Sequence, residues 1–183
     1  METVCSECGA GLDPTRSRRP ARFCSNACRQ KAYRRRRRTE FPAALREGRR
    51  WVRADGKRPI MADGRPASSI NPRTWANFAD VQVGAGDGFG VMLGGGIGCI
   101  DLDGALDGRG RVVSPVARAV LDANPGAWVE VSVSGRGLHV FGLLRDGPGS
   151  CRDGVEVYSR ARFIRVTGNV FRPGGLVPLV VPS

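Results

Sequence analysis

The most regular alternation of apolar and polar positions lies in residues 98–104. Ile100 and Leu102 alternate there with Asp101 and Asp103. Successive side chains of a β-strand point to opposite faces, so the two apolar residues are expected to enter a core while the two carboxylates share the other face. The pattern therefore predicts a buried strand with a pair of acids at its end.

Similar apolar runs predict several further short strands, at residues 51–52, 89–93, 128–133, 138–141, 154–158 and 163–168. The strand at 89–93 is expected to form a hairpin with the Asp101 strand, and the strand at 154–158 is expected to pair with the one at 163–168. The glycines at 94–96 lack the Lys-Ser/Thr ending of a phosphate-binding loop, so they predict a turn.

Two helices are expected between these strands. Asn71-Pro72 is a typical helix start, with Asn71 as the cap, and apolar residues follow at core spacing to residue 81. Ser114 begins a second helix that ends near residue 124.

The chain has 183 residues and a net charge of +12, which is unevenly distributed. Residues 1–50 hold 14 Lys and Arg against 5 Asp and Glu, whereas the remainder holds 15 against 12. A basic N-terminal third is expected of a module that sits on a polyanion. No apolar run approaches the roughly 18 residues of a membrane helix, and the N-terminus lacks a signal-peptide stretch, so we expect a cytoplasmic protein without a membrane partner.

Four of the six cysteines form two close pairs. Two residues separate Cys5 from Cys8, three separate Cys24 from Cys28, and fifteen lie between the pairs. This spacing is typical of a zinc site, and bound Zn²⁺ would supply the folding free energy that so small a module cannot obtain from a core. Two disulfides are the alternative, disfavoured by the lack of a secretion signal.

A helix capped by Ser25 is expected to start at the second cysteine pair and to run into five consecutive arginines: Arg34, Arg35, Arg36, Arg37 and Arg38. Nucleic-acid phosphates would relieve their mutual repulsion and release counterions. Such runs are often solvated faces, but beside a zinc module this one favours contact with a nucleic-acid backbone. The predicted organisation is a zinc module with a basic helix at 1–38, a linker at 39–50 and a larger domain at 51–183.

The carboxylates of Asp101 and Asp103 are expected to hold a divalent cation. Like charges a few ångströms apart repel unless a cation lies between them, and hard oxygen ligands select Mg²⁺ or Mn²⁺. Glu156 stands on the polar face of its own predicted strand and can join them. Such a carboxylate cluster is typical of metal-assisted phosphoryl transfer. The alternative is a strand that runs into an Asp-Gly turn with both acids solvated.

A glycine-rich turn and a histidine add candidate phosphate-binding groups. Ser134, Gly135 and Arg136 form a turn in which the backbone can approach a ligand closely, with a hydroxyl and a guanidinium beside it. His139 follows in the next strand and would point at the same ligand, although a single histidine in an apolar strand is more often a core residue. Arg165 is a further candidate for triphosphate or template contact, with surface solvation as its alternative.

These segments, in this order and spacing, resemble the three motifs of the archaeo-eukaryotic primase superfamily, and most closely its primase-polymerase branch encoded by phages and plasmids. The motifs are residues 100–104, 132–139 and 155–168, and the likeness extends over about residues 45–170. It implies an α/β (α+β), primase-like catalytic core with an RRM-like sheet. It also implies that Asp101, Asp103 and Glu156 hold Mg²⁺ or Mn²⁺.

The resemblance assigns His139 the phosphates of the incoming nucleotide, with help from Ser134 and Arg136. The implied enzyme is a DNA primase and polymerase, a nucleotidyltransferase that works on a single-stranded DNA template and primer with nucleoside triphosphates, in phage or plasmid replication. Many relatives carry a helicase after this core, so a separate replicative helicase is a candidate partner. Two alternatives stay open: a metal-dependent nuclease, and a non-catalytic zinc-containing DNA-binding protein of replication or regulation.

Overall fold

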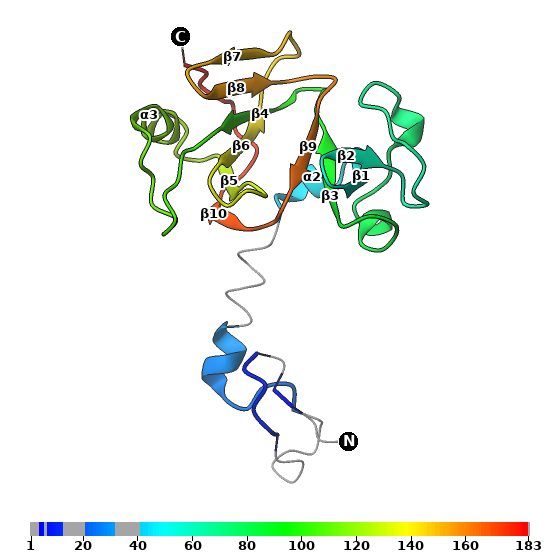
Figure 1. The fold of residues 1–183 in the computed structure, drawn as a ribbon, viewed down its shortest axis with the longest axis vertical. Coiled ribbons are helices and arrows are strands. Elements are labelled where there is room, and N and C mark those ends of the chain that lie inside the picture. Colours follow the sequence, from blue (N-terminus) through cyan, green and yellow to red (C-terminus); the bar gives the residue numbers. More distant parts are fainter. Residues whose placement is uncertain (1–3, 6, 13–20, 32–40, 183) are drawn as a thin grey trace. The chain divides into compact units, whose positions relative to one another are not determined.

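The computed structural model describes residues 4–5, 7–12, 21–31 and 41–182. The chain divides into two compact units, Met1–Glu40 and Phe41–Ser183 (Figure 1). The second unit has the expected α+β class, with mostly antiparallel strands and few helices in its described part.

Two sheets make up the second unit. The smaller sheet has the order β2-β1-β3-β9, formed by β1 (Trp51–Asp55), β2 (Arg58–Ile60), β3 (Gly88–Met92) and β9 (Phe163–Val166). The larger sheet has the order β10-β5-β6-β4-β8-β7, formed by β4 (Ile97–Leu102), β5 (Trp128–Val131), β6 (Leu138–Leu143), β7 (Ser150–Arg152), β8 (Val155–Tyr158) and β10 (Val170–Arg172). The paired strands of both sheets run antiparallel.

The larger sheet carries an apolar cluster on each face. On one face Ile100 and Leu102 pack with the buried side of helix α3 (Pro115–Ala123). On the other face Cys99 and Phe141 pack with residues of the smaller sheet. Helix α3 and the smaller sheet therefore lie on opposite sides of the larger sheet (Figure 1). The alternation in β4 places Asp101 on the face turned toward the smaller sheet.

Helix α3 forms where the sequence predicts it because Ser114 caps it. The Ser114 Oγ accepts a hydrogen bond from the Ala117 N–H at 3.2 Å, and Pro115 occupies the first turn. Both features stabilise a helix N-terminus, where backbone N–H groups lack partners.

The prediction of one helix from Asn71 to residue 81 is wrong. The structure has two short 3₁₀ helices instead, η2 (Pro72–Thr74) and η3 (Ala79–Val81). Asn71 does cap the first of them, but Ala76 then exchanges two backbone hydrogen bonds with Trp51 at the start of β1. This pairing draws the chain into an extended conformation and interrupts the helix.

Both predicted hairpins are also wrong. Strands β3 and β4 belong to different sheets, and so do β8 and β9. A strand has two edges, and those of β4 are occupied by β6 and β8, while those of β8 are occupied by β4 and β7. The chain does turn at Gly94, as expected, because the N–H of Gly94 donates to the Ile97 carbonyl at 3.2 Å.

Residues 41–50, which fall in the expected linker, are part of the second unit. Phe41 and Leu45 are buried in its core, and Leu45 lies in helix α2 (Ala43–Arg46). The indole N–H of Trp51 donates to the Leu45 carbonyl at 3.0 Å. The apolar side chains of this segment therefore find burial against β1, and the second unit begins before the predicted boundary.

Candidate acidic site and four-cysteine cluster

Four charged or titratable side chains form a row across the larger sheet. Glu130 of β5, His139 of β6, Asp101 of β4 and Glu156 of β8 are successive cross-strand partners. Directly opposed residues of antiparallel strands project from the same face. The structure thus brings together Asp101, His139 and Glu156, which come from distant parts of the sequence. We call these four residues the charged row.

Asp103 lies just beyond the end of β4, next to the charged row. Its N–H donates to the Gly154 carbonyl at 3.0 Å, and its side chain is exposed. Burial raises the pKa of Asp101; the charge of His139 opposes this, and the charges of Asp103 and Glu156 add to it. Carboxylates that oppose one another's ionisation in this way favour a cation between them.

The three acids share a region of the sheet without forming a tight ligand cluster. Within the described part of the chain, the four cysteines alone form a group of three or more His, Cys, Asp or Glu whose ligand atoms all lie within 4.8 Å of one another. A cation shared by Asp101, Asp103 and Glu156 would therefore require their side chains to rotate. Exposed Asp103 and half-buried Glu156 have room for such rotation.

Glu156 is engaged by two neighbours on the same side of the sheet. Its Oε2 accepts a hydrogen bond from the Tyr158 hydroxyl at 2.7 Å and lies 3.9 Å from the Arg162 guanidinium. The same guanidinium stacks over the Tyr158 ring, 4.1 Å from its centroid. Burial and the hydrogen bond to Glu156 raise the pKa of Tyr158 to about 12, so the phenol stays a donor at neutral pH. Arg162 therefore places a positive charge beside the acids.

Glu130 anchors His139 and is the site residue that sequence reasoning missed. Its side chain is fully buried, and its Oε1 lies 2.9 Å from the imidazole Nδ1. The Nε2 atom lies 3.8 Å from Asp101 Oδ1, beyond hydrogen-bond length. Burial lowers the pKa of His139, but the hydrogen bond and charge of Glu130, with smaller effects of the aspartates, outweigh it and raise the pKa overall. The missed signal was an acid in the apolar segment Trp128–Val131, because such an acid needs a buried partner.

The predicted phosphate-binding turn joins β5 to β6 at the Asp103 end of the sheet. The Ser134 Oγ accepts from the Arg136 N–H at 3.2 Å, and the Arg136 carbonyl accepts from the Leu106 N–H at 2.9 Å. Gly135 has a φ of 72°, which glycine adopts without strain. Ser134, Gly135 and Arg136 are all exposed, so the turn is accessible to a ligand.

Arg165 does not join this site. It alternates along β9 with Ile164 and Val166, whose side chains enter the core between the sheets. Its own side chain therefore lies on the outer face of the smaller sheet, where it pairs with Asp87 at 3.2 Å and donates to the Gly56 carbonyl. Arg165 was expected to contact triphosphate or template, but the β3–β9 pairing turns its side chain away from the charged row, so it is not placed to bind a nucleotide there.

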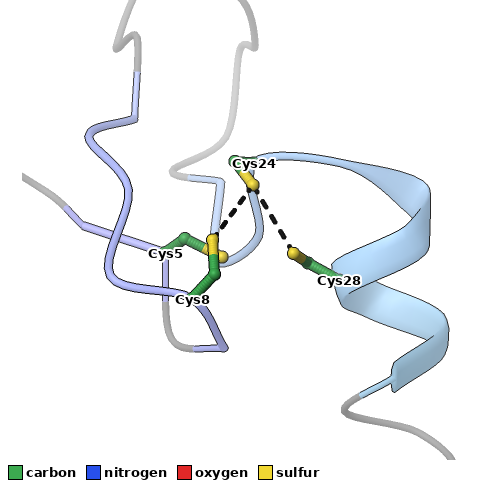
Figure 2. A group of neighbouring side chains, drawn as sticks. All are labelled: Cys5, Cys8, Cys24 and Cys28. Carbon is green, nitrogen blue, oxygen red and sulfur yellow. Dashed lines mark hydrogen bonds between the residues drawn. The ribbon is translucent and has the colours of Figure 1, made fainter.

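The four cysteines predicted as metal ligands converge in the first unit (Figure 2). The Sγ of Cys24 lies 3.5 Å from that of Cys8 and 3.6 Å from that of Cys28. Ligands of a tetrahedral zinc site with Zn–S bonds of about 2.3 Å would be roughly 3.8 Å apart, whereas a disulfide would bring two sulfurs to about 2.05 Å. All four cysteines are free, so the structure supports a metal-binding cluster rather than two disulfides.

Local backbone geometry holds these sulfurs together. The Cys5 N–H donates to the Ala10 carbonyl at 2.8 Å, which closes a turn around the first pair. The second pair lies at the start of a helix over residues 26–31, where the Ser25 Oγ accepts from the Cys28 N–H at 3.2 Å, as predicted. In Figure 2, Cys5 and Cys8 lie on the turn and Cys28 on the helix.

Crowding of the sulfurs shifts their pKa values in opposite directions. Backbone N–H groups, first that of Cys24, lower the pKa of Cys5 to about 6. Hydrogen bonds with the sulfurs of Cys8 and Cys28 raise the pKa of Cys24 to about 12. A metal binds thiolates, so a bound cation would displace the shared protons.

The predicted arginine run, residues 34–38, lies outside the described residues. Among the helices that the structure describes, none is long and apolar enough to cross a membrane.

Comparison with protein-family models gives no match, and comparison with curated proteins gives none either. Function must therefore be argued from the two sites themselves.

Proposed function

We propose that the second unit is a metal-dependent nucleotidyltransferase, a primase-polymerase domain of the archaeo-eukaryotic primase type. The proposal is carried by the charged row, in which Asp101, His139 and Glu156 come from three adjacent strands and project from one face. Phosphoryl transfer uses carboxylates for cations and cationic side chains for phosphates. The larger sheet, with α3 packed on one of its faces, is compatible with an RRM-like core.

Asp101, Asp103 and Glu156 are the residues that would hold Mg²⁺ or Mn²⁺. Their hard oxygen donors and their mutual effect on the pKa of Asp101 fit a divalent cation. Such a cation, when bound, neutralises phosphate charge and lowers the pKa of a primer 3′-hydroxyl.

Other side chains around the row suit a nucleoside triphosphate. The imidazole of His139 directs Nε2 toward Asp101, and the exposed turn carries Ser134 and Arg136 at the Asp103 end. Their roles in this proposal are to bind the phosphates and hold the α-phosphate near the acids. Backbone amides of the turn add neutral donors, which favour anions without a fixed charge.

The first unit is proposed to bind Zn²⁺ through its four cysteines and to contact single-stranded DNA. The sulfur spacing supports zinc, and the excess of Lys and Arg in residues 1–50 supports contact with phosphates. Such contacts position a template without reading its sequence.

One assay tests the enzyme proposal. Purified protein is incubated with single-stranded template, labelled nucleotides and Mn²⁺ or Mg²⁺, with and without a primer, beside an Asp101→Ala/Asp103→Ala variant. We expect labelled extension products that are lost in the variant. Shortened template would instead favour a nuclease on the same acids, and DNA binding without any product would favour a non-catalytic DNA-binding protein.

A further inference from the structure

Glu130 is the most deeply buried acid of the charged row. It lies at the middle of β5 with a fully buried side chain, whereas Asp101 keeps 20% of its side-chain surface exposed. A carboxylate is costly to bury unless hydrogen bonds satisfy both of its oxygens. The partners of Glu130 therefore indicate why the protein keeps an acid at this position.

The two oxygens of Glu130 have different partners. Oε2 accepts from the backbone N–H groups of Thr167 at 3.0 Å and Gly168 at 2.9 Å. The Thr167 hydroxyl is also 3.3 Å from Oε2, and it donates to the Val131 carbonyl at 2.7 Å. The connection from β9 to β10 thus fixes the carboxylate, and Oε1 is left for His139.

This arrangement determines the orientation of the imidazole. Oε2 already accepts from two backbone N–H groups, and a carboxylate can only accept hydrogen bonds. The Nδ1 atom, 2.9 Å from Oε1, must then carry a proton and donate it. The Nε2 atom is left facing Asp101, at a distance that forms no hydrogen bond.

We propose that Glu130 is a positioning residue: held by the Thr167–Gly168 backbone, it accepts the Nδ1 proton of His139 and fixes the ring, and so aims Nε2 at the space beside Asp101, where the N–H of a doubly protonated ring donates to a bound phosphate. The part that concerns the phosphate rests on the proposed nucleotidyltransferase function. The part that concerns the ring follows from the geometry alone, so the two can be tested separately.

The protonation of the His139 ring can be tested without an activity assay, because His139 is the single histidine of the chain. Nitrogen-15 NMR of the histidine-labelled full chain reports which nitrogens of the imidazole carry protons. We expect a proton on Nδ1 in the wild-type protein, in the neutral and in the doubly protonated ring. In Glu130→Gln the amide oxygen can still accept from Thr167 and Gly168, so its NH₂ group faces Nδ1 and the proton should move to Nε2. A wild-type ring without a proton on Nδ1 would overturn the proposal, whether or not the variant folds.

The consequence for phosphate binding is tested by a double-mutant cycle with Glu130→Gln and His139→Ala in the extension assay. We expect Glu130→Gln to raise the KM for nucleotide about tenfold with a smaller effect on kcat, because its NH₂ group disfavours the doubly protonated ring and leaves only a neutral donor for the phosphate. It should have no further effect in the His139→Ala background. An equal loss in both backgrounds would show a structural role and refute the proposal. If no extension is seen at all but the NMR result holds, the proposed function fails while the positioning of His139 stands.

Discussion

Removal of metal from the four-cysteine cluster should unfold the first unit while leaving the second intact. Among residues 4–5, 7–12 and 21–31, Cys5 is the one buried apolar side chain, and the side chain of Glu7 is 3% exposed. Fully burying one apolar side chain contributes only about 1.5–3 kcal/mol, whereas structural Zn²⁺ contributes about 10–16 kcal/mol in zinc-finger peptides at neutral pH. The contribution of the metal is therefore larger by several-fold, and the described residues of the unit bury too little apolar surface to keep it folded without the metal.

The assay is limited proteolysis of the full chain with trypsin. Arg29 and Lys31 lie in the helix that carries Cys28, so cleavage after either residue reports opening of this helix. We expect a chelator or the Cys24→Ser substitution to increase the cleavage rate at least tenfold, and added Zn²⁺ to reverse the chelator effect. The thermal transition of the second unit should not change.

Cys151→Ser is the matched control, because Cys151 is exposed and lies outside the cluster. It should retain about one zinc per chain and wild-type cleavage rates. Equal cleavage of the helix with and without metal would refute the reasoning, since the helix would then be held by contacts other than the cluster.

Three further predictions concern the second unit. Arg53→Met should lower the free energy of unfolding by roughly 3 kcal/mol in denaturant titration, because the buried guanidinium donates to four carbonyls of residues 81–86 that would lose their partner. Asn124→Ala should cost roughly 2 kcal/mol in the same assay, because the buried amide joins α3 to the C-terminal segment. The N–H groups of Gly96 and Gly95 lower the pKa of Asp146, so its contribution to stability is present above its unfolded value and is lost as pH falls below about 4. The difference in Tm between wild type and Asp146→Asn should therefore shrink between pH 6 and pH 3; a constant difference would contradict this.

Local patterns in the sequence predict the elements that depend on neighbouring residues. Alternation identifies β4 and the burial of Ile100 and Leu102, and a capping serine identifies α3. The spacing of the cysteines likewise identifies the four-cysteine cluster, which could hold a metal ion. In each case, short-range geometry decides the outcome.

The pairing of strands that are distant in the sequence could not be predicted from local patterns. Adjacent strands in the sequence were expected to form hairpins, but the edges of β4 are occupied by β6 and β8. The same long-range pairing places Arg165 on the outer face of the smaller sheet and Glu130 beside His139. Strand pairing decides which side chains face one another across a sheet, and it depends on contacts between distant parts of the chain. The sequence therefore predicted only part of the site.

The most direct test of the account is template-directed primer extension by Glu156→Gln, compared with wild type and with Glu47→Gln. Glu156 belongs to the charged row, whereas Glu47 is an exposed acid next to α2, so the same chemical change is made at both positions. The account predicts that extension falls at least a hundredfold in Glu156→Gln and is unchanged in Glu47→Gln, with both variants folded. Wild-type extension by Glu156→Gln would contradict the claim that acids from β4 and β8 act on one cation.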